Sequence, residues 1–309
     1  NKPYPYFNGK WYRSTDEIAA ISKVTYEILQ KVSPEVPHHY VPHAVNSSVF
    51  YKFKTPEDKA RASVLREKIY NDNTFKEIQN KNKKLFFWNN RNARRKQSGT
   101  LLWWFKEWLD KVGHDQATLL MHTDARDPHG QDLPHLIDHL GVNKGQVLLS
   151  TNKVDASDLA SMYNAADYTI NISDAEGFGL GTLESLACGT PIIVNMTGGL
   201  QEQVTDGENW FGWGIQPSSK AVIGSLEVPY IYEDRVSQED FEKALTSALK
   251  ASKKSYNKMS TNGMKHVAKN YNFEKFERQW VEIMDNIVKK YGSWETRKGY
   301  KKWHFMEVA

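Results

Sequence analysis

Residues 173–184 carry the sequence SDAEGFGLGTLE, the stretch that decides the fold. An apolar run at 168–172 precedes it and a helical pattern at 180–187 follows it, so it is predicted to form the turn between a strand and a helix. Its glycines allow the backbone to approach a ligand closely. The free N–H groups at the start of the helix, together with the helix dipole, favour a diphosphate at this point.

Two carboxylates flank the glycine turn, Glu176 before it and Glu184 a little over one turn into the helix. A carboxylate accepts hydrogen bonds from two adjacent hydroxyls, such as those of a ribose, which suits Glu184. Glu176 is placed to reach sugar hydroxyls on the other side of the phosphates. The glycines alone would favour an ordinary strand–helix turn, and it is the Glu-x7-Glu spacing that makes a sugar- and phosphate-binding site the stronger interpretation.

Strands and helices alternate along most of the chain, which is typical of a doubly wound parallel sheet. Apolar runs predict strands at 85–88, 117–121, 146–149, 168–172 and 191–195. Helical patterns predict helices at 101–112, 133–140, 156–165 and 180–187. The predicted fold class is therefore α/β, with a Rossmann-like parallel sheet.

Further elements are expected before this alternation. A strand, a helix and a second strand are predicted at 16–22, 25–32 and 39–41. A strongly charged, exposed helix is predicted at 55–70, and the polar segment 71–84 is expected to be solvated.

A long helix is predicted near the C-terminus, with Asn272 as its N-cap and Gly292 as its end. Its apolar residues share one helical face, namely Phe273, Phe276, Trp280, Ile283, Met284 and Ile287. The tail 293–309 mixes aromatic and basic residues. We expect the tail to pack back on the protein with its charges in water, while contact with a membrane surface or an acidic partner is the alternative.

The composition of the chain excludes several classes of protein. The 309 residues are 39% hydrophobic and 25% charged, which indicates a globular protein rather than a disordered one. The net charge of +4 is too balanced to indicate nucleic-acid binding. No run of eighteen apolar residues is present, so no transmembrane helix is predicted. Cys188 is the only cysteine and is predicted to be a buried structural thiol, and a reducing, cytoplasmic location is expected.

A basic cluster, Asn89-Asn90-Arg91-Asn92-Ala93-Arg94-Arg95-Lys96, follows the strand at 85–88. Ligands of open α/β sheets bind at the carboxyl ends of the strands, so these cations are expected to face the ligand crevice. Fixed cations there stabilise a diphosphate as it leaves. Arg94 and Arg95 are expected to be solvated or to cap a helix. Without the glutamates, a nucleic-acid patch or an exposed face would be the better interpretation.

The glutamate block resembles the donor-site signature of the family-4 retaining glycosyltransferases. The resemblance continues through Ala187-Cys188-Gly189-Thr190-Pro191-Ile192-Ile193 and Gly198-Gly199-Leu200-Gln201-Glu202. Upstream, 20–22 and 41–46 resemble the end of that family's first domain and its linker. The resemblance covers the chain from about Asp16 onward. It implies a GT-B fold and transfer of a sugar from a nucleotide sugar with retention of the anomeric configuration.

The resemblance also assigns site residues. It implies that Glu176 lies by the donor sugar, that Glu184 holds the ribose, and that Arg91 and Lys96 match the family's Arg-x4-Lys pair. Catalytic roles are therefore predicted for Glu176, Arg91 and Lys96. The predicted donor-binding residues are Glu184, Gly177, Phe178, Gly179, Leu180, Gly198, Gly199, Leu200, His122 and Thr151. Thr151 follows the strand whose end holds the nucleobase in the family, and His122 ends a neighbouring strand.

No metal or other cofactor is expected. No Asp-x-Asp pair, which metal-dependent transferases of another fold use to hold a divalent ion, occurs in the sequence. His122, Asp124, Asp127 and His129 cluster after a strand, but their spacing fits no standard zinc site, and they are interpreted as polar loop residues.

The predicted domains are a remnant of the N-terminal acceptor domain with its linker at 1–48, the donor-binding Rossmann-like domain at 49–271, and the crossover helix with its tail at 272–309. Most of an acceptor domain is missing, including the family's acceptor-side catalytic histidine and its glycine loop. The sequence is therefore expected to be truncated or to work with a separate acceptor-domain chain.

The donor is expected to be a nucleotide sugar and the acceptor a glycan or another hydroxyl compound. A non-catalytic module that binds sugar nucleotides or glycans, and a sugar-nucleotide epimerase of the same fold, remain as alternatives. A glycan phosphorylase would need a lysine for pyridoxal phosphate, and no convincing one is found.

Overall fold

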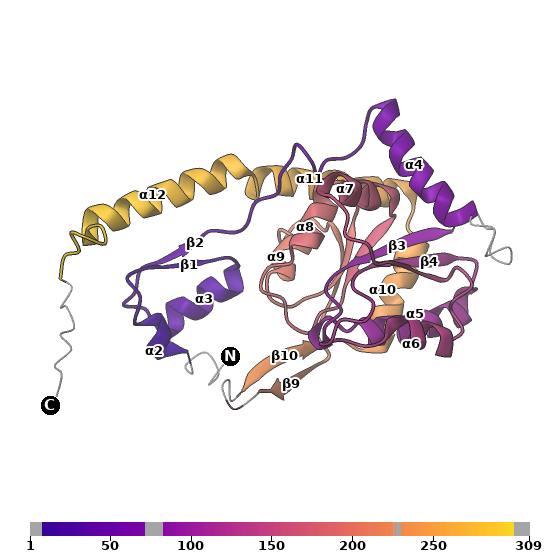
Figure 1. The fold of residues 1–309 in the computed structure, drawn as a ribbon, viewed down its shortest axis with the longest axis horizontal. Helices are drawn as coiled ribbons and strands as arrows, with labels where there is room; N and C mark the ends of the chain where they lie inside the picture. Colours follow the sequence, from indigo (N-terminus) through magenta and orange to yellow (C-terminus); the bar gives the residue numbers. More distant parts are fainter. Residues whose placement is uncertain (1–7, 72–82, 225, 227–229, 300–309) are drawn as a thin grey trace.

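The computed structural model describes residues 8–71, 83–224, 226 and 230–299. Its centre is a six-stranded sheet in which every neighbouring pair is parallel (Figure 1). The strands are β3 (Lys84–Asn89), β4 (Ala117–His122), β5 (Val147–Ser150), β6 (Tyr168–Asn171), β7 (Ile192–Asn195) and β8 (Gly212–Ile215). The predicted α/β fold class is confirmed. Most of the predicted solvated segment at 71–84, and the end of the tail beyond residue 299, lie outside the described residues.

The strand order, β5-β4-β3-β6-β7-β8, fixes where a ligand binds. The chain winds outward from β3 to β5 and then returns to lay β6 on the other side of β3. The helices that follow β3 and β6, on opposite faces of the sheet, therefore diverge, and ligands of such sheets bind in the crevice at the carboxyl ends of these two strands. This is the strand order of a dinucleotide-binding Rossmann sheet.

Helices cover both faces of the sheet. One face carries α5 (Ser98–Val112), α6 (Leu133–His139) and α10 (Gln238–Leu249), which pack on one another and on β8. The other carries α4 (Pro56–Asn71), α7 (Ala156–Ala165), α8 (Leu180–Ala187) and α11 (Lys253–Asn270). Burial on both faces explains the continuous apolar run at 85–88, where all four side chains are fully buried.

A separate unit precedes the large sheet. It consists of the short helix α2 (Gly9–Tyr12), β1 (Ile18–Ala20), α3 (Lys23–Val32) and β2 (His38–Tyr40), with β1 and β2 parallel. The side chain of Ser22 caps α3 by accepting a hydrogen bond from the backbone N–H of Thr25. The strand–helix–strand pattern predicted at 16–41 is thus confirmed.

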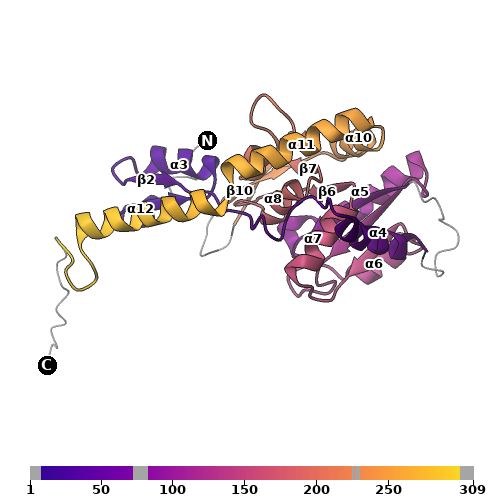
Figure 2. The ribbon, with the colours of Figure 1, turned by 90° about the horizontal axis from the view of Figure 1, so that it is seen from above.

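The long helix α12 (Phe273–Tyr291) runs along this N-terminal unit (Figures 1 and 2). Asn272 caps it through the backbone N–H of Lys275, and it ends at Gly292, which has φ 86°, as the sequence predicts. Gln279 donates a hydrogen bond to the carbonyl of Tyr40. Of the predicted apolar face, Ile283 is buried, whereas Phe273 and Met284 are exposed.

The two segments that connect the units run side by side. The backbone N–H of Val45 donates to the carbonyl of Tyr271 over 2.9 Å, and Val45 pairs with Asn272 as an isolated bridge. The domain boundaries at 48 and 271 remain predictions. In the tail, the expectation of packing holds for Arg297, which pairs with Asp16, but Trp294 is 94% exposed.

The sequence alone does not resolve the region 196–271 into elements. The structure places there α9 (Leu200–Val204), β8, the hairpin of β9 (Ser219–Ile223) and β10 (Ile231–Arg235), α10 and α11. The strands here are short and carry glycine, tryptophan or charged residues, and α11 is mostly polar, so neither gives a clear periodic pattern. Within the described residues, no helix is both long and apolar enough to cross a membrane.

We predict that Gly212→Ala destabilises the sheet. A Cβ at this position would lie 1.8 Å from the carbonyl oxygen of Ile192 on β7, so β8 would have to shift. Overpacking of this kind costs about 1–3 kcal/mol in the free energy of unfolding. Chemical denaturation measures the loss. The control is Gly207→Ala, where no atom lies within 4 Å and only the positive φ of 98° is unfavourable. An equal or smaller loss for Gly212→Ala would contradict this packing.

Candidate functional site

The loops after β3 and β6 meet at the crevice through an ion pair between Lys96 and Glu176. Lys96 ends a 3₁₀ turn, η2 (Arg94–Lys96), and Glu176 precedes the glycine turn. Both side chains are largely buried, at 9% and 10% exposed. Burial lowers the pKa of the Lys96 amine, and the charge of Glu176 opposes this shift. Two predicted catalytic side chains are therefore in contact.

The backbone and neighbouring side chains hold this contact in place. The N–H of Asp174 donates to the carbonyl of Arg95 over 2.9 Å, and the Arg95 guanidinium donates to the carbonyl of Ala175 over 2.7 Å. Gln97 has a left-handed backbone, with φ 57°, and its amide donates to the carboxylate of Asp174. A non-glycine residue in this conformation needs support from its surroundings, and such residues concentrate at functional sites.

Arg94 and Arg95 correct an expectation. The sequence predicts that they are solvated or cap a helix, and their side chains are about half exposed, but both are engaged. Arg94 makes an ion pair over 2.6 Å with Glu233, whose own side chain is almost fully buried. Arg95 lies 3.7 Å from Glu176 and holds the 174–176 backbone. The conformational entropy that the two arginine side chains lose on ordering is offset by charge-assisted hydrogen bonds to these fixed acceptors.

Glu184 lies on α8 and is partly buried. The hydroxyl of Tyr163 donates to its carboxylate over 2.9 Å, and the Asn89 amide in turn donates to that hydroxyl over 2.9 Å. Burial raises the pKa of the Glu184 carboxyl to about 7, and the Tyr163 hydrogen bond opposes the shift. This chain connects Glu184 to the carboxyl end of β3. A Cβ on Gly181 would lie only 3.1 Å from the Tyr163 hydroxyl, so a small residue is needed there.

The start of α8 is open to an anion. Its N-cap, Gly179, has φ 93° and offers no side chain to the first N–H groups of the helix. Leu180, the first residue of the helix, is 47% exposed. Uncapped N–H groups and the positive end of the helix dipole attract a phosphate.

The second glycine loop packs against the first. The N–H of Gly199 donates to the Glu176 carbonyl over 3.2 Å, and a Cβ on Gly198 would lie 1.7 Å from that oxygen. Leu200 is fully buried, and Phe178 is buried against the rings of His43 and Tyr271. The side chains of Phe178 and Leu200 are therefore packing groups, and the loops can offer only backbone groups at these two positions.

Arg91 is not brought to Glu176. Its guanidinium pairs with Asp127 over 2.6 Å and lies 2.8 Å from the ring of His129. It lines a separate pocket of about 310 Å³ at the carboxyl ends of β3, β4 and β5, which His122 and Thr151 also line. Burial lowers the pKa of His122 and so favours its neutral form, and a hydrogen bond with Ser150 opposes this shift. Arg91 and Lys96, the predicted basic pair, thus lie at two neighbouring positions: Arg91 lines this pocket, and Lys96 contacts Glu176.

The polar loop after β4 is held by its own hydrogen bonds. Asp127 accepts from the backbone N–H of His129, and Asp124 accepts from that of Arg126. In the part of the chain that the structure describes, no group of three or more His, Cys, Asp or Glu side chains is arranged to hold a metal ion. Cys188 is buried and burial raises the pKa of its thiol, in agreement with a structural role.

The β9–β10 hairpin contributes to the site in a way that the sequence does not predict. Arg235 pairs with Asp174 over 3.2 Å, and the N–H of Asp234 donates to the carbonyl of Asp174 over 2.8 Å. Burial raises the pKa of the Asp174 carboxyl to about 6. The charged run Glu233-Asp234-Arg235 is the available signal, but nothing in its spacing relates it to a residue so far upstream.

Comparison with known proteins agrees with this geometry. The family described as glycosyl transferases group 1 matches residues 71–266. This range contains the six-stranded sheet and both glycine loops. The chain belongs to this family.

Curated relatives of the family match part of the chain. A D-inositol 3-phosphate glycosyltransferase from Catenulispora acidiphila is 36% identical over 105 residues, which are 33% of this chain and 24% of that protein. The enzyme of that name from Mycobacterium tuberculosis is 39% identical over 75 residues, 24% of this chain and 15% of that protein. The aligned region thus spans about a quarter or less of these relatives.

Solved structures share the fold. The sucrose-phosphate synthase of Thermosynechococcus elongatus superposes with a TM-score of 0.69 at 20% identity, covering 92% of this chain and 61% of that one. HepE from Anabaena, solved with UDP and glucose, superposes with a TM-score of 0.65 at 15% identity, covering 90% and 67%. These neighbours are GT-B glycosyltransferases, which confirms the predicted GT-B fold.

We predict that Glu184 makes nucleoside binding depend on pH. Its pKa rises from 4.5 in the unfolded chain to about 7 in the fold, so the carboxyl carries a proton below about pH 7. In the predicted role of Glu184, the ionised carboxylate accepts hydrogen bonds from both ribose hydroxyls, and a proton on it removes one acceptor. Affinity for the preferred nucleoside, measured by calorimetry, should therefore rise several-fold between about pH 6 and about pH 8.

Glu184→Gln is the control for this prediction, since its affinity should not change over that range. The folding stability depends on pH in the opposite direction to the nucleoside affinity. The native state loses stability as pH rises from about 4.5 to about 7, because burial disfavours the charged form. The gain in melting temperature from Glu184→Gln should thus be larger at about pH 8 than at about pH 5. An equal gain at both would show that Glu184 titrates normally.

Proposed function

We propose that this chain is the donor-binding part of a retaining, metal-independent glycosyltransferase that transfers a sugar from a nucleoside-diphosphate sugar. The observation that carries the proposal is the contact of Lys96 with Glu176 at the point where the strand order reverses, directly beside the uncapped start of α8. A cation and free N–H groups converge there, which is what a pyrophosphate requires.

The chemistry follows from the charges. As the acceptor hydroxyl oxygen bonds to the anomeric carbon of the sugar, the bond from that carbon to the diphosphate breaks. The electron pair of the broken bond goes to the diphosphate, whose negative charge grows and whose oxygen can take up the hydroxyl proton. Lys96 and the N–H groups of α8 are fixed in the fold and stabilise that charge without reorganising. Glu176, freed from Lys96 when the diphosphate arrives, is then available to a hydroxyl of the donor sugar. Glu184 holds the ribose, and Arg91 with Thr151 lines the neighbouring pocket for the base.

The proposal also concerns the residues that bind the acceptor. The chain covers 61% of the first solved neighbour, and the described N-terminal unit has only two strands. We infer that acceptor-binding residues outside this sequence, in the same polypeptide or in a separate acceptor-domain chain, complete the cleft. The acceptor is a glycan or another hydroxyl compound. The single buried thiol of Cys188 supports a reducing, cytoplasmic setting.

A thermal-shift screen tests the proposal. UDP, GDP and ADP, with and without their sugars, are added in the presence and absence of a chelator. A nucleoside diphosphate that raises the melting temperature equally with and without chelator is the expected result, because cations of the protein hold the phosphates. Stabilisation that disappears on chelation would overturn metal independence. Binding without transfer, even after an acceptor domain is added, would favour a non-catalytic binding module.

We predict that Lys96→Ala weakens binding of that nucleoside diphosphate by about 1.5–3 kcal/mol, because a charge-assisted contact is lost. This corresponds to roughly 10- to 150-fold in Kd by calorimetry. Binding of the nucleoside without phosphates should stay unchanged. Lys106→Ala is the matched control, since Lys106 is a lysine of α5 that pairs with Asp110 away from the crevice. Unchanged affinity in Lys96→Ala would remove Lys96 from the site.

A further inference from the structure

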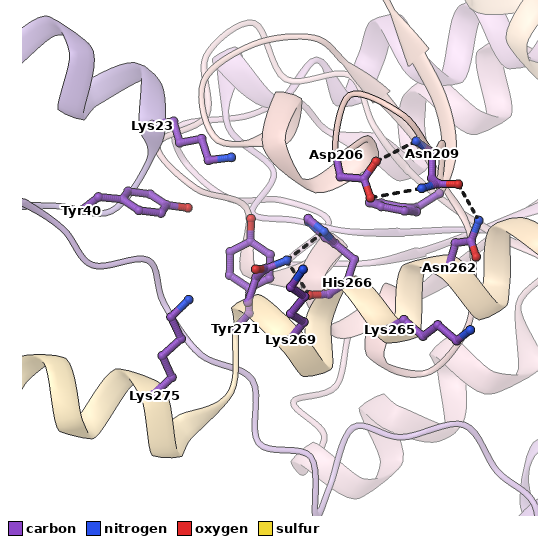
Figure 3. A pocket seen from close by; sticks show the side chains of 12 residues that line it. Lys23, Tyr40, Asp206, Asn209, Asn262, Lys265, His266, Lys269, Tyr271 and Lys275 are labelled. Atoms are coloured by element: carbon purple, nitrogen blue, oxygen red, sulfur yellow. Dashed lines mark hydrogen bonds between the residues drawn. The ribbon is translucent and has the colours of Figure 1, made fainter.

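A second polar pocket lies apart from the donor site, at the junction of the N-terminal unit with α11 and α12 (Figure 3). Its volume is about 410 Å³, within the range of small-molecule sites. None of the predicted donor-site residues lines it. The donor site occupies the carboxyl ends of β3 and β6, whereas this pocket is formed by α3, β2, the 206–211 segment and the two long helices.

Four lysines line the pocket: Lys23 from α3, Lys265 and Lys269 from α11, and Lys275 from α12. None of them forms an ion pair with a described residue. Lys265 and Lys269 stand one turn apart on the same helix, where like charges repel. Lys23, Lys265 and Lys269 are exposed to solvent, and the charge of Lys23 also acts on the carboxylate of Glu202. The concentration of positive charge at one concave surface favours binding of an anion there.

The lining contains a single carboxylate, Asp206, and its charge is already engaged. Its Oδ1 accepts from the backbone N–H groups of Glu208 and Asn209, and Asn209 in turn accepts from the Asn262 amide over 3.3 Å (Figure 3). The pocket therefore keeps a surplus of positive charge. The amides of Asn209 and Asn262 each donate one hydrogen bond within the protein, and the second N–H of each can donate to the hydroxyls of a ligand.

The pocket spans the connection between the two units. Beneath it, the buried carboxylate of Glu202 accepts from the Lys23 backbone N–H and from the Tyr40 hydroxyl, both at 2.8 Å. The carbonyl of Glu202 lies 2.9 Å from the His266 ring on α11. Glu202 thus ties α3 and β2 to the donor-binding sheet. A ligand held by Lys23 on one side and Lys269 on the other bridges the same two units.

We propose that this pocket binds a phosphate-bearing polyhydroxyl ligand, such as a sugar phosphate, at a site separate from the donor site, and that the ligand fastens the N-terminal unit to the donor-binding sheet. Several ammonium groups match a group that carries about two negative charges at pH 7. The amides match the sugar hydroxyls. Bridging of two units predicts that the ligand raises the melting temperature of the whole chain.

Calorimetry and thermal shift with glucose 6-phosphate, inorganic phosphate and glucose test the proposal. Glucose 6-phosphate should bind and stabilise, inorganic phosphate should bind more weakly, and glucose alone should not bind. The variant Lys265→Gln with Lys269→Gln should weaken glucose 6-phosphate binding at least tenfold. Equal affinities for glucose 6-phosphate and inorganic phosphate would identify a free-phosphate site and overturn the sugar-phosphate assignment.

Two further variants distinguish binding in this pocket from attraction to surface charge and from binding in the donor site. Lys253→Gln with Lys254→Gln removes the same charge from the exposed first turn of α11, outside the pocket, and should leave binding unchanged. Equal weakening in both double variants would reduce the effect to general surface charge and overturn the site. Lys96→Gln should leave glucose 6-phosphate binding intact. Loss of binding in Lys96→Gln would place the ligand in the donor site instead, and this result would leave the proposed donor function standing.

Discussion

The ion pair between Lys96 and Glu176 is the contact on which the arrangement of the candidate site depends. It joins the loops that follow β3 and β6, the two strands between which the order of the sheet reverses. A buried pair of this kind contributes little net stability, because desolvation opposes the attraction. Its value lies in placement, since it holds a cation and a carboxylate at the crevice, where a charged ligand can compete for either partner.

The surrounding polar network keeps these two side chains in place. The carboxylate of Asp174 accepts from Gln97 and pairs with Arg235, and its backbone N–H donates to the carbonyl of Arg95. The hairpin of β9 and β10 therefore supports the site through Arg235. On the other side, Glu202 follows the second glycine loop and fastens the N-terminal unit. One short glycine-rich segment thus contacts the loop of Glu176 through the backbone N–H of Gly199 and connects the two units through the carboxylate of Glu202.

The sequence predicts the sheet well because its strands are buried on both faces and its helices have apolar stripes. The helix predicted at 180–187 matches the observed bounds of α8, since its pattern and its glycine turn agree. The β9–β10 hairpin and α11 are not predicted from the sequence, because short or mostly polar elements depend on tertiary contacts for their structure. The proximity of Lys96 and Glu176 follows from their positions just after two parallel strands, whose carboxyl ends lie at the same edge of the sheet. The engagement of Arg91 by Asp127 does not, since it depends on how the loop after β4 folds back on the loop after β3.

Hydrogen–deuterium exchange with the nucleoside diphosphate that stabilises the chain most gives the most direct test of the central claim. The account predicts slower exchange at the glycine turn and the first turn of α8, over residues 176–183, and around Lys96, because the phosphates cover those N–H groups. The same slowing should be much weaker with the nucleoside alone. Slower exchange confined to α11 and the start of α12, with no change over 176–183, would contradict it.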